Sequence, residues 1–302
     1  MNTLHLHTPR GGHVAARVFE PPAGTPTTLQ AVIGAAMGVP QRYYADFAAW
    51  LATQGVRVLT FDYRGHADSL ALLQHRRVRH VDATLHDWRA DYEAATLHLH
   101  ALAPELPLRL IGHSLGAQLP GLFERTDHID GLLAVAAGSG YWRQNAPQLR
   151  RRVLFMWHGL VPVLTPLFGY FPGRRIGAVG DLPAGVIRQW RRWCLHPDYS
   201  GSEGPAARQR YAAVCFPILA LSISDDEMMT LPGTQSLLAL YANAPHAIER
   251  VTPASATWAG STAATRPTCG RTRCRPCVRC RSAWRRRPRD NSVPCRVLTS
   301  RP

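Results

Sequence analysis

Apolar and polar residues alternate in the first part of the chain. Residues 3–8 and 13–19 both alternate, and the turn-forming stretch Pro9-Arg10-Gly11-Gly12 separates them, which predicts a β-hairpin. Two short apolar runs follow, at residues 29–35 and 56–62. Runs of this length bounded by turn residues predict buried strands.

Two other stretches repeat their apolar residues every three or four positions, which predicts helices with one buried face. The first ends before Gly55, a residue typical of helix C-termini. The second begins near Leu85, and Asp82 is placed to cap its start. The repeating residues are Tyr43, Tyr44, Phe47, Trp50 and Leu51 in the first stretch and Leu85, Trp88, Tyr92, Ala95, Leu99 and Leu102 in the second.

The remaining segments alternate between strand and helix patterns, with one interruption. This alternation predicts an α/β fold with a mostly parallel sheet and helices on both faces. Residues 141–210, rich in Trp, Arg, Pro and Gly, break it and predict an inserted cap. Strands are predicted at 107–111, 131–137, 214–222 and 247–251, and a helix near 233–241, which gives a core of residues 1–140 and 211–253, a cap or lid over 141–210 and a tail over 254–302.

The longest apolar run, residues 153–171, is close to the length of a membrane-spanning helix. His158, Pro162 and Pro166 interrupt it, whereas a spanning helix usually holds about 20 apolar residues with few breaks. We therefore predict a buried or cap-forming segment and no membrane span. The first twenty residues lack the pattern of a secretory signal, so we expect a cytoplasmic protein.

The net charge of +15, taken over the whole chain, suggests a nucleic-acid partner. The position of the charged residues along the chain changes this interpretation. The chain has no lysine, and 12 of its 35 arginines lie in residues 252–302 with a single acid, Asp290. The other 251 residues carry 23 arginines and 19 acids. The globular part is therefore only mildly basic, and we do not expect it to bind nucleic acid.

The tail, residues 254–302, lacks hydrophobic periodicity, and we expect it to be disordered. We interpret it as the product of a reading-frame shift in a GC-rich gene, which translation of the other frames past codon 254 would test. The alternative is a zinc- or nucleic-acid-binding tail built on Cys274, Cys277 and Cys280. Zinc sites take four ligands, usually as two separated pairs, and this spacing gives no such set.

A candidate nucleophile lies directly after the predicted strand at 107–111. Residues 112–116 read Gly-His-Ser-Leu-Gly, which matches the G-x-S-x-G nucleophile elbow and places Ser114 at its centre. The glycines leave room for a strand to turn into a helix within one residue. Ser139, in Gly138-Ser139-Gly140, is the competing serine, but no helix pattern follows it.

The chain resembles bacterial α/β-hydrolases of the serine-aminopeptidase-like, uncharacterised branch. The resemblance covers residues 3–253 and is carried by Asp62-Tyr63-Arg64-Gly65, Ser69, the 112–116 elbow with Gln118, and the segments 138–143, 169–172 and 182–183. It implies an α/β-hydrolase fold and hydrolysis of an ester or amide carbonyl. It also implies that Asp226 is the acid of the catalytic triad, with Asp225 as its rival.

The same resemblance places the oxyanion hole at the backbone N–H groups of Leu115 and of Met37, or else Ala36. It implies a small-molecule substrate and no cofactor or metal. The Trp- and Leu-rich cap favours an apolar acyl group. The sequence leaves the reaction subtype and the oligomeric state open.

The expected triad histidine is missing from the expected place. Relatives carry it after the last strand, beyond Pro253, but the last histidine of this sequence is His246, before that strand. Without a base within hydrogen-bonding distance a serine hydroxyl is a poor nucleophile. We therefore expect a serine hydrolase with doubtful activity, and the alternative is an inactive hydrolase-like binding scaffold. Pro120 is also expected to disturb the helix after Ser114.

Overall fold

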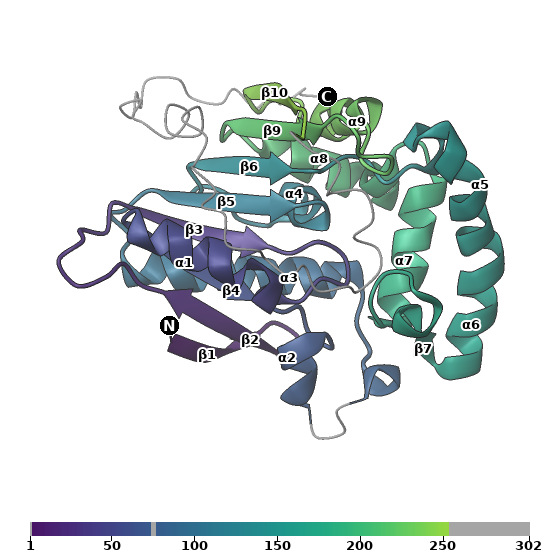
Figure 1. Cartoon of the computed structure of the whole chain (residues 1–302), viewed down its shortest axis with the longest axis horizontal. Helices are drawn as coiled ribbons and strands as arrows, with labels where there is room; N and C mark the ends of the chain where they lie inside the picture. Colours follow the sequence, from purple (N-terminus) through teal and green to yellow (C-terminus); the bar gives the residue numbers. More distant parts are fainter. Residues whose placement is uncertain (1, 74–76, 254–302) are drawn as a thin grey trace, which may run out of the picture. The chain divides into compact units, whose positions relative to one another are not determined.

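The computed structural model describes residues 2–73 and 77–253, all of which belong to one compact unit. One sheet of eight strands runs through it, in the order β1-β2-β4-β3-β5-β6-β9-β10 (Figure 1). Its strands are β1 (Asn2–Thr8), β2 (Gly12–Phe19), β3 (Leu29–Gly34), β4 (Val56–Phe61), β5 (Leu108–His113), β6 (Gly131–Val135), β9 (Ile218–Ile223) and β10 (His246–Val251).

The sheet is parallel except at its first edge. β1 and β2 form the predicted hairpin, with Thr8 opposite Gly12, and β2 pairs antiparallel with β4. All later neighbours are parallel. The carboxyl ends of β3, β4, β5, β6, β9 and β10 therefore meet at one edge of the sheet, which we call the carboxyl edge.

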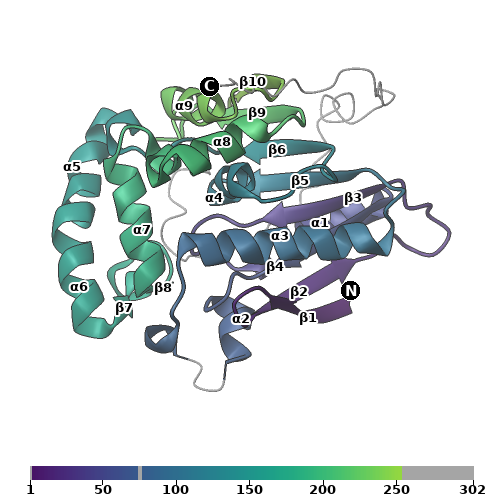
Figure 2. The ribbon, with the colours of Figure 1, turned by 180° about the vertical axis from the view of Figure 1, so that it is seen from behind.

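Helices lie on both faces of this sheet, as predicted. α1 lies over the face turned to the viewer in Figure 1, and α3 covers the opposite face, seen in Figure 2. The helices outside the insertion are α1 (Ala45–Thr53), α2 (Ala67–Ala71), α3 (Leu85–Leu102), α4 (Leu115–Gln118), α8 (Pro205–Ala213) and α9 (Leu231–Leu240).

The segment predicted as a cap is helical and begins after β6. α5 (Pro147–Phe155) continues through a π-turn (Met156–Leu160) into α6 (Val161–Phe168). The short pair β7 (Tyr170–Phe171) and β8 (Leu182–Pro183) then leads to α7 (Ala184–Leu195), which lies between the sheet and the α5–α6 pair in both views (Figures 1 and 2). α8 spans residue 210, so the predicted boundary falls inside a helix.

The apolar run at 153–171 is therefore divided between α5, the π-turn, α6 and β7. Within the described part of the chain no helix has both the length and the apolar composition needed to cross a membrane. α3 begins at Leu85, as predicted, but the predicted capping residue was wrong, because Thr84 and not Asp82 is the N-cap. The Thr84 backbone N–H donates to the Asp87 carboxylate at 2.9 Å, which closes a capping box.

Two other sequence predictions concern α4 and the tail. The α-helix after Ser114 ends at Gln118 and continues as a 3₁₀ turn over residues 119–122, so Pro120 does limit it. The tail, with its proposed frame shift and its cysteine cluster, lies outside the described residues.

Candidate active site

The turn between β5 and α4 holds Ser114 in a strained backbone conformation. Its φ is 51° and its ψ −109°, a region that non-glycine residues enter at a cost of about 1–3 kcal/mol. The Ser114 N–H donates to the carbonyl of Val135 at 3.0 Å, and the Ser114 carbonyl accepts from the Ala117 N–H at 3.0 Å. Ser114 therefore links the last residue of β6 to the first turn of α4.

The two glycines around Ser114 are required by close backbone packing. A Cβ at Gly116 would lie 2.0 Å from the carbonyl oxygen of Gly34, at the end of β3. A Cβ at Gly112 would lie 2.5 Å from the Ala117 nitrogen. Both spacings are far inside van der Waals contact, so the strand, the turn and the helix can pack this closely only with glycine at both positions.

Ser114 lies at the carboxyl edge, where its side chain is half-buried. In the described part of the chain its hydroxyl makes no hydrogen bond. Ser139, in contrast, is buried, and its hydroxyl donates to the Gln144 side chain. The competing serine is thus engaged in a hydrogen bond, which favours Ser114 as the candidate nucleophile.

Two backbone N–H groups are candidates for the oxyanion hole. Leu115 is the first residue of α4, where an N–H has no acceptor within the helix. The loop after β3 supplies the other, and β3 pairs with β5 so that Gly34 is opposite Gly112. The Ala36 N–H donates to the Tyr44 hydroxyl at 3.0 Å, whereas the Met37 N–H has no acceptor among the described residues. The hydrogen bonding therefore favours Met37 over Ala36 as an oxyanion donor.

Asp226 follows β9 at the same carboxyl edge. One oxygen of its carboxylate, Oδ1, accepts hydrogen bonds from the backbone N–H groups of Met228 and Met229, at 2.9 and 2.8 Å. No described residue donates to Oδ2. Asp225 is exposed and makes no hydrogen bond within the described chain. Asp226 is thus the acid that is both held in place and left with one free oxygen.

His113 directly precedes Ser114, and its side chain is hydrogen-bonded to Tyr44. Its Nδ1 lies 2.9 Å from the Tyr44 hydroxyl, which accepts the Ala36 N–H and can donate its own proton to the ring. Burial lowers the pKa of His113, and the negative charge of Asp226 raises it in part, with a net decrease. His113 is therefore neutral at pH 7 and fixes the loop after β3.

His246 lies at the wrong edge to act as a base. It is exposed at the first residue of β10, with Nδ1 3.0 Å from the carbonyl oxygen of Ala244. Val251, at the carboxyl edge, is five positions further along the strand, a distance of about 16 Å at roughly 3.3 Å per residue. The positions at which relatives carry the triad histidine lie beyond Pro253, outside the described residues.

Comparison with known proteins identifies the family of the chain. The family model for serine aminopeptidase, S33, matches residues 35–186, half of the chain. The chain belongs to this family. No curated protein sequence matches it.

Solved structures share the fold at low identity. A thermostable carboxyl esterase from Bacillus coagulans is 14% identical, with 83% of this chain and 89% of that chain covered and a TM-score of 0.58. A monoglyceride lipase from Saccharomyces cerevisiae is 12% identical, with coverage of 83% and 87% and a TM-score of 0.57. At such identities the likeness shows the fold alone, and it confirms the predicted α/β-hydrolase class.

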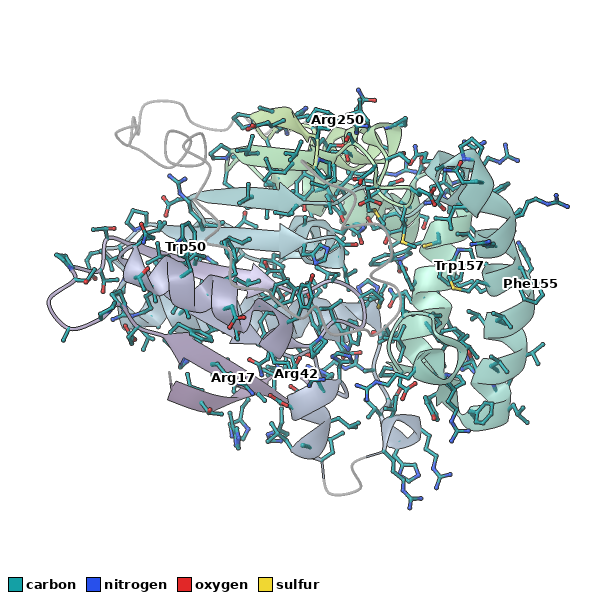
Figure 3. The ribbon with its side chains drawn as sticks, viewed as in Figure 1. Arg17, Arg42, Trp50, Phe155, Trp157 and Arg250 are labelled. Atoms are coloured by element: carbon teal, nitrogen blue, oxygen red, sulfur yellow. The ribbon has the colours of Figure 1, made fainter. Side chains whose placement is uncertain are left out.

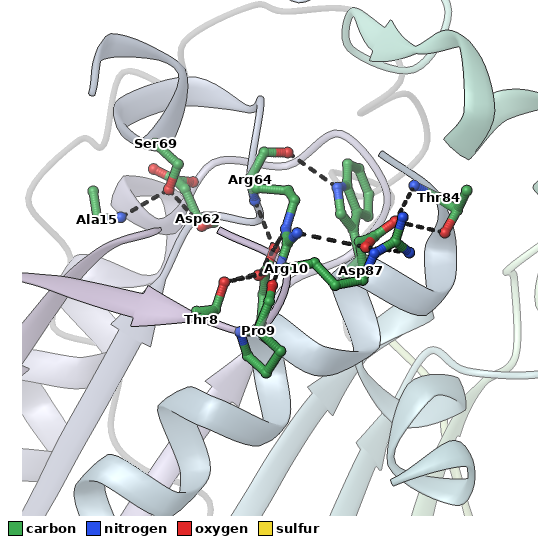
Figure 4. Close-up of polar contacts among 11 residues, drawn as sticks. Thr8, Pro9, Arg10, Ala15, Asp62, Arg64, Ser69, Thr84 and Asp87 are labelled. Atoms are coloured by element: carbon green, nitrogen blue, oxygen red, sulfur yellow. Dashed lines mark hydrogen bonds and ion pairs between the residues drawn. The ribbon is translucent and has the colours of Figure 1, made fainter. Parts of the chain in front are cut away.

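The Asp62-Tyr63-Arg64-Gly65 segment of this hydrolase serves packing. The Arg64 guanidinium donates to the Asp91 carboxylate on α3 at 2.6 to 3.1 Å. It also donates to the carbonyl of Pro9 at 2.9 Å, and both of these residues are labelled in Figure 4. The Ser69 hydroxyl donates to the Asp62 carbonyl at 2.6 Å and accepts the Ala15 N–H at 2.8 Å. These contacts join the β1–β2 hairpin and the loop after β4 to one another and to α3.

The inserted segment of the S33 chain contacts the candidate oxyanion loop directly. A Cβ at Gly38 would lie 2.6 Å from the Gly180 nitrogen, and a Cβ at Gly180 would lie 2.8 Å from the Gly38 carbonyl oxygen. The Tyr199 hydroxyl donates to the Gln118 side chain of α4 at 2.8 Å. The loop after β3 and the helix after Ser114 are therefore both held by the insertion.

Proposed function

We propose that this chain is a serine hydrolase of ester or amide carbonyls in which Ser114 is the nucleophile. The observation that carries the proposal is the positive φ of Ser114 at the strand-to-helix turn. Backbone strain of this kind persists only where the surrounding structure enforces it, and it often accompanies reactive side chains. The turn places Ser114 directly between the end of β5 and the start of α4.

In this proposal the Ser114 oxygen attacks the carbonyl carbon, and the negative charge that develops on the carbonyl oxygen is stabilised by the N–H groups of Leu115 and Met37. The α4 N-terminus adds its positive dipole end. Asp226 would orient a histidine through its free Oδ2 and stabilise the cationic ring. The apolar and aromatic residues of the insertion favour an apolar acyl group, because ligand pockets are mostly apolar.

The sequence has no histidine after His246, and this determines the expected rate of acylation. Without it, the attack depends on solvent to take the Ser114 proton, and removal of a triad member typically costs several orders of magnitude. We therefore propose that acylation of Ser114 is slow. The competing function, an inactive scaffold that binds a ligand at the same edge, predicts no acylation.

Covalent labelling with a fluorophosphonate, with and without added imidazole, separates the two functions. We expect slow labelling that imidazole accelerates, because free imidazole can supply the base that a triad histidine would provide. Ser114→Ala removes the labelling, and the matched variant Ser139→Ala leaves it unchanged. Asp226→Asn lowers only the imidazole-dependent rate.

Two results would overturn the proposal. Labelling that persists in Ser114→Ala would place the nucleophile elsewhere. Wild-type protein that stays unlabelled at every imidazole concentration would favour the inactive scaffold.

A further inference from the structure

The outer side of the α5–α6 pair exposes a stripe of apolar side chains. Phe155, Val163 and Leu167 are 63%, 61% and 72% exposed. Trp157, two residues after Phe155, is 2% exposed and packs edge-on against Trp190 of α7, with ring centroids 5.0 Å apart. Figure 3 labels both side chains, and the inner one supplies the packing while the outer one is left to solvent.

The π-turn aligns these exposed residues along one line. The eight residues from Phe155 to Val163 would rotate about 80° beyond two full turns on a regular α-helix. The π-turn at Met156–Leu160 takes up one extra residue, which returns Val163 to within about 20° of Phe155. Leu167 is one turn further, and the exposed Pro162 and Pro166 widen the stripe.

Arginines flank both ends of the stripe. Arg151 and Arg152 are exposed at its start, and Arg174 and Arg175 are exposed beyond its end. The Arg175 guanidinium lies over the Phe168 ring, 5.3 Å from its centroid. None of these four arginines forms a salt bridge with any other described residue. Their charges are therefore free to meet an external anionic partner.

The charge of the insertion is opposite to that of the rest of the globular chain. Residues 141–195 hold nine arginines and one acid, Asp181, whereas the other residues up to 251 hold 14 arginines and 18 acids. A molecule with this asymmetry turns its α5–α6 side toward a negative surface. The exposed stripe and the unpaired arginines then reach that surface together.

We propose that the α5–α6 stripe, meaning Phe155, Val163, Leu167 and their flanking arginines, docks this protein onto anionic lipid surfaces. Apolar side chains on one helix face enter the boundary between headgroups and acyl chains, and arginines bind the lipid phosphates. A nucleic acid would use the arginines but would leave the apolar residues in water. The proposal is independent of Ser114, since it requires no chemistry.

Sedimentation with lipid vesicles tests the docking in the full chain. The vesicles contain phosphatidylcholine with or without about a third of phosphatidylserine. We expect binding to the anionic vesicles that falls at least tenfold in Phe155→Ser/Val163→Ser/Leu167→Ser. Arg151→Gln/Arg152→Gln should weaken it by about fivefold for each charge removed.

The matched control changes exposed aromatics on α1. Phe47 and Trp50 are each 42% exposed and stack on each other, so Phe47→Ser/Trp50→Ser loses similar apolar area away from the stripe and should bind as wild type. Circular dichroism melts establish that each variant is folded.

Three outcomes would overturn the proposal. Equal binding by wild type and both stripe variants would assign lipid binding to the arginine-rich tail. Equal binding to neutral and anionic vesicles would remove the role of charge. A wild type that ignores both vesicle types but forms dimers that the triple variant loses would assign the stripe to a second copy of the chain.

Discussion

The buried ion pair between Arg64 and Asp91 allows a quantitative prediction. Asp91 on α3 is 0% exposed and Arg64 is 7% exposed. The Arg64 Nε lies 2.9 Å from Asp91 Oδ1 and 3.1 Å from Oδ2, and a terminal nitrogen lies 2.6 Å from Oδ1. Arg64→Met keeps much of the side-chain volume and removes all three of these hydrogen bonds.

The expected loss of stability depends on the hydrogen bonds that Asp91 retains in the variant. In the variant its carboxylate retains the Thr8 hydroxyl at 2.6 Å and the backbone N–H of residue 64 at 2.9 Å. Removing one partner of a buried pair costs about 3–5 kcal/mol, and the two retained bonds place this case near 3 kcal/mol. The exposed pair Arg125–Asp127, with side chains 65% and 69% exposed, is the matched control, and Arg125→Met should cost ~0–1 kcal/mol.

The loss should also depend on pH. Burial raises the pKa of Asp91, and the hydrogen bonds and charge of Arg64 lower it in part. Without Arg64 the folded-state pKa rises further above its value in the unfolded chain. The folded state then binds the proton more tightly, so lowering the pH reduces the deficit of the variant relative to wild type.

Urea unfolding at pH 7 and pH 5 measures both effects. Arg64→Met/Asp91→Leu should be less destabilised than the sum of the two single variants, because neither charge is left buried alone. A loss below about 1 kcal/mol for Arg64→Met, or strict additivity in the double variant, would refute the assignment of this pair as a buried structural ion pair.

Two further predictions concern the elbow and the insertion. Gly116→Ala should lower the free energy of unfolding by at least ~1–3 kcal/mol, because its Cβ would overlap the Gly34 carbonyl. Gly131→Ala is the control in the same urea assay and should be near neutral, because its Cβ has its nearest neighbour at 3.4 Å. Equal losses in the two variants would contradict the packing argument. Burial raises the pKa of Glu203, but hydrogen bonds from Gln189, Trp193 and His86 lower it more, so its pKa lies below the ordinary value. The stability that this carboxylate adds is present above pH ~4.3 and is lost as the pH falls through its lowered pKa. Glu203→Gln should remove that part of the acid dependence, and an unchanged pH profile would contradict it.

Local patterns predicted most of the elements because their causes are local. Alternation with a Gly-Gly turn suffices for the β1–β2 hairpin, and the apolar spacing from Leu85 suffices for α3. The β9 start was predicted four residues early, because the apolar run 214–222 hides where strand pairing begins. Pairing starts at Ile218, after Pro217, whose nitrogen carries no hydrogen to donate.

The contacts that position the site come from residues far apart in the sequence, and spacing alone could not predict them. Arg64 and Asp91 pair across 27 positions, and Gly38 packs on Gly180 across 142. One signal for the first pair was present, since Asp91 lies within the apolar face that Trp88 and Tyr92 define. A charge on a buried helix face requires a partner.

The net charge of residues 1–251 also concealed how the charges are distributed along the chain. Residues 1–251 taken together are only mildly basic, and this sum hides nine arginines in the insertion against an acidic excess elsewhere. The structure adds what the charges alone lack, namely that the arginines flank an exposed apolar stripe on α5–α6. The candidate oxyanion donors, in contrast, were available from resemblance, and the Tyr44–Ala36 hydrogen bond now favours Met37.

We propose that the Ser114 hydroxyl, on a turn with positive φ, reacts in front of the backbone N–H groups of Leu115 and Met37. A crystal structure of the protein after reaction with an organophosphonate tests it most directly. We predict phosphorus bonded to Ser114 Oγ, with a phosphoryl oxygen about 2.7–3.1 Å from the nitrogens of both Leu115 and Met37. An adduct on another residue, or a phosphoryl oxygen turned away from both nitrogens, would contradict the account.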